Sequence, residues 1–339
     1  MNLGTCRALA SVLLMACSVA AVAGATHRVA WRAEYRRPAV PVSYPKENPY
    51  TPAKAHLGKL LFFDPILSGS RSRSCATCHN PSLSWTDSLP RALSDTQTPM
   101  PLRSPTLLNV GTVPILGWDG KFPSLEAVTF GPITAANNMN LSEADLVKRL
   151  AAIPGYVEAF RAAFGEDAIS RRNIERAVAT YERSIVSAPA PFDRWIDGDK
   201  KAISEQAKRG FDVFNGKANC AACHSGWAFT DGSFHDIGSS TGDDIGRGQF
   251  FPTSKKLKYA FKTPTLRDVA RRSPYMHDGS VTTLAEVIEL YNRGGIDRPS
   301  RSNEIKPLGL TEREKADLIA FLETLTGDMK PEAVPVLPR

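Results

Sequence analysis

The sequence contains two nearly identical pentapeptides, Cys75-Ala-Thr-Cys78-His79 and Cys220-Ala-Ala-Cys223-His224. In each, two thiols stand three positions apart, so they share one turn of a helix, and a histidine follows directly. This pattern is the attachment signal for a c-type haem: the thiols bond the two vinyl groups and the histidine presents a neutral imidazole to the iron. Each pentapeptide therefore predicts one covalently bound haem c.

Other uses of paired cysteines fit this sequence less well. A zinc ribbon needs its two cysteine pairs about 15–20 residues apart, and far more than that separates Cys78 from Cys220. A redox Cys-x-x-Cys stands between a strand and a helix, whereas the surrounding sequence has helical patterns. The two remaining cysteines, Cys6 and Cys17, lie near the N-terminus. We expect no disulfide in the mature chain.

Length and composition exclude several classes of protein. The 339 residues suit two domains of ordinary size. An apolar fraction of 42% and a charged fraction of 23% exclude a disordered chain and a multi-span membrane protein. The formal charge is +7, from 42 Lys+Arg against 35 Asp+Glu. No nucleic-acid-binding motif accompanies this charge, so we expect no nucleic-acid partner.

Residues 1–25 predict a secretory signal peptide. Arg7 supplies the positive end, a mostly apolar run follows, and Ala23-Gly24-Ala25 is a small-residue cleavage site. No later segment approaches 18 consecutive apolar residues, so we expect no membrane span after cleavage and an exported, periplasmic protein. A lipoprotein anchor at Cys17 is the less favoured alternative, because apolar sequence continues beyond it.

The mature chain predicts a proline-rich, irregular extension over residues 26–50 and mainly helical structure after it. Helix N-terminal signals occur at Thr51-Pro52 and in capping-box patterns at 142–145, 283–286 and 311–314. A long apolar stripe follows helical spacing: Ile174, Ala177, Val178, Tyr181 and Ile185. The Ala/Pro-rich segment 187–191 separates residues 51–190 from 191–330, each with one motif, and 331–339 form a tail. We predict two mostly helical domains.

The sixth iron position decides function, because an iron closed by protein on both faces transfers electrons, whereas an open one can bind peroxide. No histidine lies between His79 and His224, so the first domain offers no distal histidine and its haem is a candidate open site. Met100 and Met139 are the thioether alternatives there. For the second haem the candidates are His235, Met276, His277 and Tyr291. Periodicity alone favours Tyr291 as a buried core tyrosine.

The order of motifs resembles the bacterial di-haem cytochrome c peroxidase and MauG family. The matching stretches are Gly58–Asp64, Ser74–Asn80, Ser104–Leu107, Trp118–Gly120, Lys262–Arg267, Pro274–Gly279 and Phe321–Gly327. They cover nearly all of residues 51–330. The resemblance implies two cytochrome c-like helical domains, each with one covalent haem, peroxide chemistry at the first haem and electron transfer through the second.

The resemblance also implies roles for three residues. Tyr291 stands where ordinary peroxidases of the family have an axial methionine and MauG has a tyrosine, so it is expected to bind the second haem iron. A phenolate ligand favours the oxidised states of iron. Trp118 matches the tryptophan that couples the two haems, with core packing as the alternative. Pro132 matches the proline over the open face of the first haem.

The chain departs from the family pattern in the peroxide pocket. Val128 and Asn138 stand where the family has a glutamine and a glutamate. Because an asparagine cannot exchange a proton as a carboxylic acid does, acid–base help from this position is in doubt. A local gap that brings Glu126 or a water into this role is the alternative.

Two further departures concern the partner protein and a metal. Ala218 replaces the surface tryptophan through which MauG oxidises its protein substrate. The family's calcium ion is held by an asparagine and main-chain carbonyls. Ser104 replaces that asparagine, while Arg272 and Pro274 still offer carbonyls, so the resemblance implies a calcium site here with an altered ligand set.

We therefore expect a periplasmic di-haem oxidoreductase that reduces hydrogen peroxide at the first haem. Its electrons would pass through the second haem from a small donor protein, a cytochrome c or cupredoxin, or from a protein substrate. A non-catalytic di-haem electron carrier is the first alternative, and it requires Met100 or Met139 to close the first haem. A MauG-type maturation enzyme that oxidises a protein substrate is the second.

Overall fold

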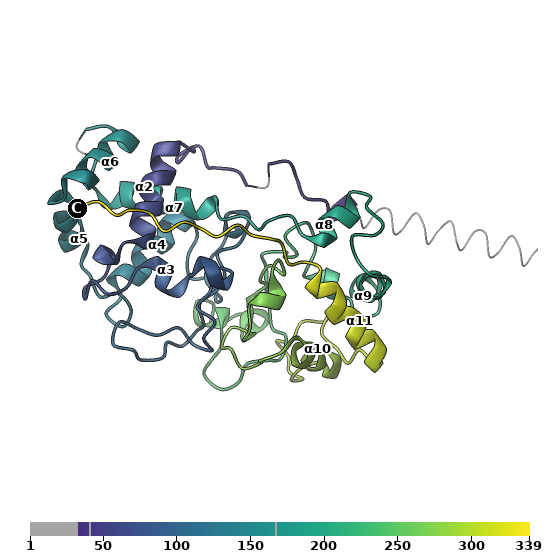
Figure 1. The fold of residues 1–339 in the computed structure, drawn as a ribbon. Helices are drawn as coiled ribbons and strands as arrows, with labels where there is room; N and C mark the ends of the chain where they lie inside the picture. The colour runs from purple at the N-terminus through teal and green to yellow at the C-terminus, as the bar shows by residue number, and fades with distance from the viewer. Residues whose placement is uncertain (1–32, 41, 167) are drawn as a thin grey trace, which may run out of the picture.

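The structure is a computed structural model that describes residues 33–40, 42–166 and 168–339. The predicted signal peptide and Cys17 lie outside these residues. The described chain is mainly helical, as the sequence predicts (Figure 1). Its helices are α2 (Pro52–Phe63), α3 (Cys75–Cys78), α4 (Leu125–Thr134), α5 (Glu143–Ala151), α6 (Pro154–Phe164), α7 (Arg171–Arg183), α8 (Pro191–Ile196), α9 (Glu205–Asn215), α10 (Leu284–Arg293) and α11 (Glu312–Glu323). Short 3-10 turns and one two-stranded antiparallel ladder, β1 (Phe234–His235) with β2 (Phe261–Lys262), complete it.

The first group of helices, α2 to α7, is built on the crossing of α2 and α7. α2 begins at the predicted N-cap Thr51, and α7 ends at Arg183, although Ile185 of the predicted stripe is buried beyond its end. The two backbones approach closely because Gly58 faces the carbonyl of Ala177, where a side chain has no room. This crossing holds two apolar clusters together beneath the first Cys-x-x-Cys-His motif.

The second group, α8 to α11, repeats this arrangement with α9 and α11. Gly210 of α9 faces the carbonyl of Asp317 in α11, as Gly58 faces α7 in the first group. α10 and α11 begin at the predicted capping boxes, with Thr283 and Thr311 as N-caps. α9 is not among the predicted helices, although Ser204 caps it. Each Cys-x-x-Cys-His motif thus lies in a group built on one glycine-mediated helix crossing.

Replacing Gly210 by alanine is expected to lower the free energy of unfolding by about 1–3 kcal/mol. In an open helix position the same change would stabilise by up to about 1 kcal/mol, so the close approach to Asp317 reverses its sign. Chemical denaturation of the haem-loaded protein measures the difference. Gln206→Ala, at an exposed position of the same helix, is the control and should change stability by less than about 0.5 kcal/mol. A stabilised Gly210→Ala variant would contradict the close approach.

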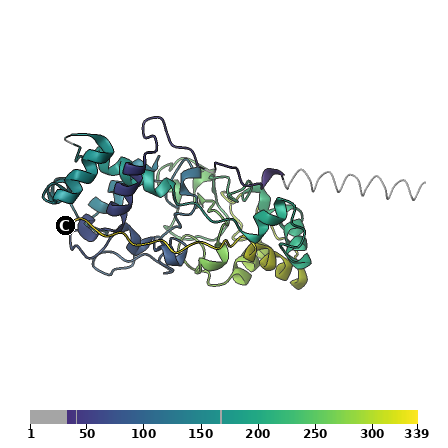
Figure 2. The same ribbon diagram turned by 45° about the horizontal axis from the view of Figure 1, so that its top comes forward.

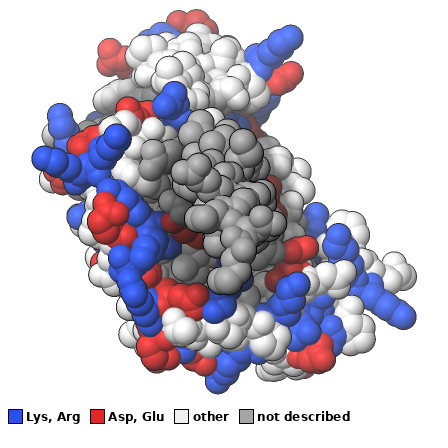
Figure 3. Space-filling view, turned by 90° about the vertical axis from the view of Figure 1, so that its right-hand side faces the viewer, with Lys and Arg blue, Asp and Glu red and all other residues white. Residues whose placement is uncertain are grey.

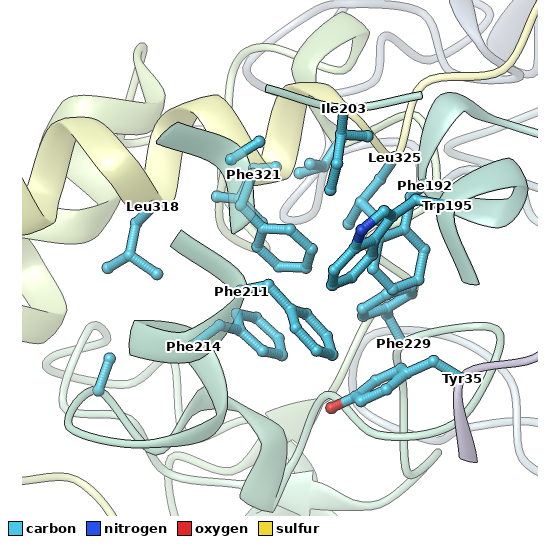
Figure 4. Close-up of a cluster of buried hydrophobic side chains, with 14 of the residues drawn as sticks. Tyr35, Phe192, Trp195, Ile203, Phe211, Phe214, Phe229, Leu318, Phe321 and Leu325 are labelled. Atoms are coloured by element: carbon cyan, nitrogen blue, oxygen red, sulfur yellow. The ribbon is translucent and has the colours of Figure 1, made fainter. Parts of the chain in front are cut away.

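The described part of the N-terminal extension is irregular, but its side chains contact both groups of helices. Tyr35 is almost fully buried in the aromatic core of the second group, where its ring stacks on Phe229 at 4.9 Å between centroids (Figure 4). Its hydroxyl donates a hydrogen bond to the Asn215 side chain at 2.9 Å. The chain then crosses to the first group, where the amide of Asn48 donates to Glu126 at 2.9 Å. The extension therefore links both groups of helices.

The C-terminal tail runs from the second group of helices back to the first. After α11 it runs back along the first group and ends beside α5 and α6, in both ribbon views (Figures 1 and 2). Glu332 pairs with Lys59 of α2 at 2.5 Å. Pro338 lies against Gly155 of α6. Residues 331–339, predicted only as a tail, thus join the two groups in space.

In the segment between the groups, 187–191, Ser187 and Ala190 are buried and Pro189 is exposed. Ser187 donates its backbone N–H to the side chain of Asn109 at 3.0 Å, and Ala190 is fully buried. The boundary at residues 190 and 191 stays a prediction.

Charges are mixed on the end of the molecule formed by α9, α10 and α11. Figure 3 shows Lys and Arg interspersed with Asp and Glu on this face. Several are paired, as Arg209 with Asp317 and Lys217 with Glu314. No helix in the described part of the chain combines the length and apolar character needed to cross a bilayer.

Candidate functional site

The first motif forms a single helical turn, α3, on the wall of a cavity of about 690 Å³, the first cavity. The backbone N–H of His79 donates to the carbonyl of Cys75 at 2.9 Å, and Thr77 accepts from the N–H of Ser74 at 3.0 Å. This turn brings Cys75, Cys78 and His79 to the cavity wall. Both cysteines are free thiols.

The His79 ring is oriented by two neighbours on its Nδ1 side. Nδ1 lies 3.4 Å from the carbonyl of Trp85 and 3.3 Å from the hydroxyl of Ser104. An Nδ1 that donates to a carbonyl leaves the Nε2 lone pair free for a metal. Burial lowers the pKa of His79 to about 4, which keeps the imidazole neutral, as an iron ligand must be.

The second motif has the same local design around a smaller, second cavity of about 190 Å³. Cys220 begins a 3-10 turn, and Cys220, Cys223 and His224 line this cavity. His224 Nδ1 lies 2.9 Å from the carbonyl of Phe229. Burial lowers the pKa of His224, so its Nε2 is also available as a ligand.

The residues of both sites fit covalently bound haem better than a thiolate-bound metal. Burial raises the pKa of the Cys75 thiol, and it raises that of Cys220 to about 12. Thiols that stay protonated disfavour zinc, which needs thiolates. On the wall of the first cavity, Arg103 has a buried Nε without a hydrogen-bond partner among the described residues. That orphaned donor matches the carboxylate of a haem propionate.

Trp118, Phe261 and Lys262 line both cavities and so form the wall between them. The indole of Trp118 donates to the carbonyl of Arg103 at 3.1 Å, and its own carbonyl accepts from the backbone N–H of Lys262 at 2.7 Å. These bonds fix the tryptophan in the shared wall. The Phe261 ring stacks on His277, with 3.6 Å between centroids.

Among the candidates for the second iron, both histidines already have partners. His277 Nε2 lies 2.8 Å from Asp244, and His235 Nε2 lies 2.7 Å from Asp231. Tyr291 projects from α10 into the second cavity, and its hydroxyl has no hydrogen-bond partner among the described residues. Burial raises the pKa of Tyr291. Met276 also lines this cavity.

His235 takes part in one further grouping. Its ring, the Asp231 carboxylate and the Cys223 thiol bring their ligand atoms within 4.8 Å of one another. The group shares Cys223 with the second motif, so it belongs to the haem site rather than to a separate metal centre.

The first cavity has no acid at the two positions where the family carries its glutamine and glutamate. Val128, Pro132 and Asn138 all line it, as the resemblance implies. Glu126 does not line it. Although burial opposes this, hydrogen bonds from Arg183, at 2.6 and 2.8 Å, and from Asn48 lower the pKa of Glu126 to about 2. This arrangement does not favour Glu126 as the acid of the first cavity.

Two of the three residues expected to hold calcium make hydrogen bonds through the expected ligand groups. The Ser104 hydroxyl donates to the carbonyl of Cys78 at 2.6 Å. The carbonyl of Arg272 accepts from the Arg103 guanidinium at 3.2 Å. A cationic side chain thus stands at one expected ligand, and no carboxylate joins Ser104, Arg272 and Pro274 among the described contacts. The calcium site with an altered ligand set stays a prediction.

Two protein-family models match this chain, one over each half. The model of the di-haem cytochrome c peroxidase family matches residues 52–201, and a cytochrome c model matches residues 207–326. The methylamine utilization protein MauG of Methylorubrum extorquens is 53% identical over 311 residues, 91% of this chain and 88% of that protein. Cytochrome c551 peroxidase of Nitrosomonas europaea is 33% identical, over 84% of this chain and 83% of its own. The crystal structure of a MauG-like protein associated with microbial copper homeostasis has a TM-score of 0.79 at 30% identity, covering 85% of this chain and 93% of its own.

Proposed function

This chain is a member of the di-haem cytochrome c peroxidase and MauG family, and from that premise we propose that it is a periplasmic enzyme that reduces hydrogen peroxide. Membership makes it a di-haem, peroxidase-like oxidoreductase. One observation carries the finer proposal: each Cys-x-x-Cys-His motif lines its own cavity, and Trp118 stands in the wall that the cavities share. The predicted signal peptide at residues 1–25 supports export.

In this proposal the chain holds two covalent haems in fixed orientation. Cys75 and Cys78 bond the first haem and His79 binds its iron; Cys220, Cys223 and His224 do the same for the second. When bound, the haems supply iron that exchanges single electrons and, where one face is free, binds peroxide. The carbonyls that accept from each Nδ1 keep both imidazoles in the tautomer that offers Nε2.

Four other residues have roles in the two cavities. Tyr291, on the wall of the second cavity, would bind the second iron and so leave it to transfer electrons. Pro132 and Asn138 border the space left for peroxide in the first cavity. Trp118 provides the aromatic contact between the two sites, held by its bonds to Arg103 and Lys262.

Electrons come from an external protein. A small periplasmic donor, a cytochrome c or a cupredoxin, is the proposed partner. Oxidation of a protein substrate, as implied for MauG, is less favoured, because the position of the MauG surface tryptophan holds Ala218. Ala218 is 6% exposed and lines the second cavity.

The resting electron paramagnetic resonance spectrum and the absorbance response to peroxide test this proposal. We expect one high-spin and one low-spin ferric haem, and a fast change of the Soret band on mixing with peroxide. Replacing both Cys75 and Cys78 by serine should remove the high-spin signal and the peroxide response while the low-spin signal persists.

A non-catalytic electron carrier is the second candidate, since Met100 and Met139 both line the first cavity. Two low-spin haems and no response to peroxide would favour it and contradict the enzyme.

A further inference from the structure

The first cavity needs a proton-exchanging group that its expected positions do not supply. Reduction of one hydrogen peroxide to two waters consumes two electrons and two protons. Val128 cannot exchange a proton, and the amide of Asn138 stays neutral at any working pH. A carboxyl group elsewhere on the cavity wall can supply the proton, and Glu182, Asp119, Asp243 and Asp244 are the carboxyls that line it.

Three of these four carboxyls are paired or exposed. Asp119 accepts a hydrogen bond from the Gln249 side chain at 2.7 Å. Asp244 bonds His277, and Asp243 is exposed to solvent.

Glu182 differs from them in burial and in bonding. It is 7% exposed, it lies near the end of α7, and its Oε2 has no hydrogen-bond partner among the described residues. α7 packs against α4, the helix that carries Val128 and Pro132. The Glu182 charge also reaches Cys75, where it raises the thiol pKa. Glu182 and Cys75 both line the first cavity.

The charged groups around Glu182 do not neutralise it. Arg183, its neighbour on α7, donates two hydrogen bonds to the Glu126 carboxylate of α4. From α2, Lys59 pairs with Glu332. Burial, opposed by Arg183 and assisted by Glu126, raises the pKa of Glu182 to about 8. Near neutral pH the neutral and ionised forms are thus close in free energy, as general acid–base catalysis requires.

We propose that Glu182 holds the exchangeable proton of the first cavity and serves as its acid–base group in place of Asn138. This inference rests on the proposed peroxide reduction. As a neutral carboxyl, Glu182 gives one proton to an oxygen of the peroxide and becomes a carboxylate. It regains a proton from solvent, the second proton of the reaction also comes from solvent, and the donor protein supplies both electrons.

Replacing Glu182 by glutamine in the haem-loaded protein tests the inference, because glutamine keeps the shape and cannot ionise. Infrared difference spectra against pH should show a carbonyl stretch of a protonated carboxyl that disappears as pH rises through about 8. The E182Q variant should lack this band, and its rate of peroxide reduction should fall by about 10²-fold or more. Glu182→Asp should retain a band, while Glu158→Gln, at an exposed site on α6, should match the wild type.

The outcomes separate this inference from the proposed function. An E182Q protein that keeps both the band and the wild-type rate would overturn the role of Glu182 and leave peroxide reduction standing. A wild-type protein that does not consume peroxide would overturn the proposed function and the catalytic role with it. In that case the infrared titration still reports whether Glu182 carries the proton.

Discussion

Replacing Arg267 by methionine is expected to lower the free energy of unfolding by about 3–5 kcal/mol. Arg267 is fully buried, and its guanidinium makes two bonds of 2.8 Å to Asp193, which is 5% exposed. Methionine would fill much of the space but would leave the Asp193 carboxylate buried without its cation. A buried charge without a partner costs more than the pair itself contributes, so the loss is large.

The same arginine also supports the second haem site. Its Nε donates to the carbonyl of Trp227 at 2.7 Å, and its guanidinium lies 5.2 Å from the centre of the Phe229 ring. The carbonyl of Phe229 orients His224. We therefore expect the Arg267 variant to disturb the spectrum of the second haem before global unfolding.

Chemical denaturation followed by circular dichroism measures the stability change. Arg171→Met is the matched control, because Arg171 also bonds carboxylates but is 48% exposed, and it should cost less than about 1 kcal/mol. The double variant with Asp193→Leu should recover much of the loss, since no buried charge then remains. An Arg267→Met protein as stable as the Arg171 control would show that Asp193 does not need the arginine.

Replacing Tyr291 by phenylalanine is expected to convert the second haem completely from low spin to high spin. The hydroxyl oxygen is the proposed ligand, and phenylalanine removes it while the ring still fills the wall of the second cavity. Tyr291→Met should restore a low-spin iron with a higher reduction potential, because a neutral thioether favours the ferrous state more than a phenolate does. Resting electron paramagnetic resonance and a potentiometric titration measure both changes.

Tyr275 provides the control for this experiment. It lines the same cavity, but its hydroxyl donates to the carbonyl of Val269 at 3.2 Å. Tyr275→Phe should therefore leave the low-spin signal in place. A low-spin signal that also persists in Tyr291→Phe would assign the iron to Met276, or to His277 after loss of its bond to Asp244.

The N-termini of four helices could be predicted from local signals in the sequence. α2, α5, α10 and α11 begin at the capping residues that the sequence shows, because a cap is a contact over three positions. α9 was missed although Ala207, Phe211 and Phe214 follow helical spacing on its buried face. The burial of Tyr35 against Phe229 carries no local signal, because it joins residues far apart in the chain.

The proposed acid–base group, Glu182, also could not be identified from the local sequence. Glu126 and Glu182 are both glutamates in helices, and nothing in their immediate sequence separates them. The packing of α4 on α7 gives Glu126 the guanidinium of Arg183 and leaves Glu182 on the cavity wall without a partner. Their pKa values therefore move in opposite directions.

The sequence by itself determined the cofactor chemistry and the helical class of this protein. Two thiols and a histidine on one turn are a local arrangement, so their spacing in the sequence is enough to predict haem attachment. Only the tertiary structure decided which residues share a cavity: Trp118 in the wall between two sites, Tyr291 in the second, and Glu182 in the first. The physical reason is that burial and partners set the protonation and ligand strength of a side chain, and both depend on helices brought together by long-range packing.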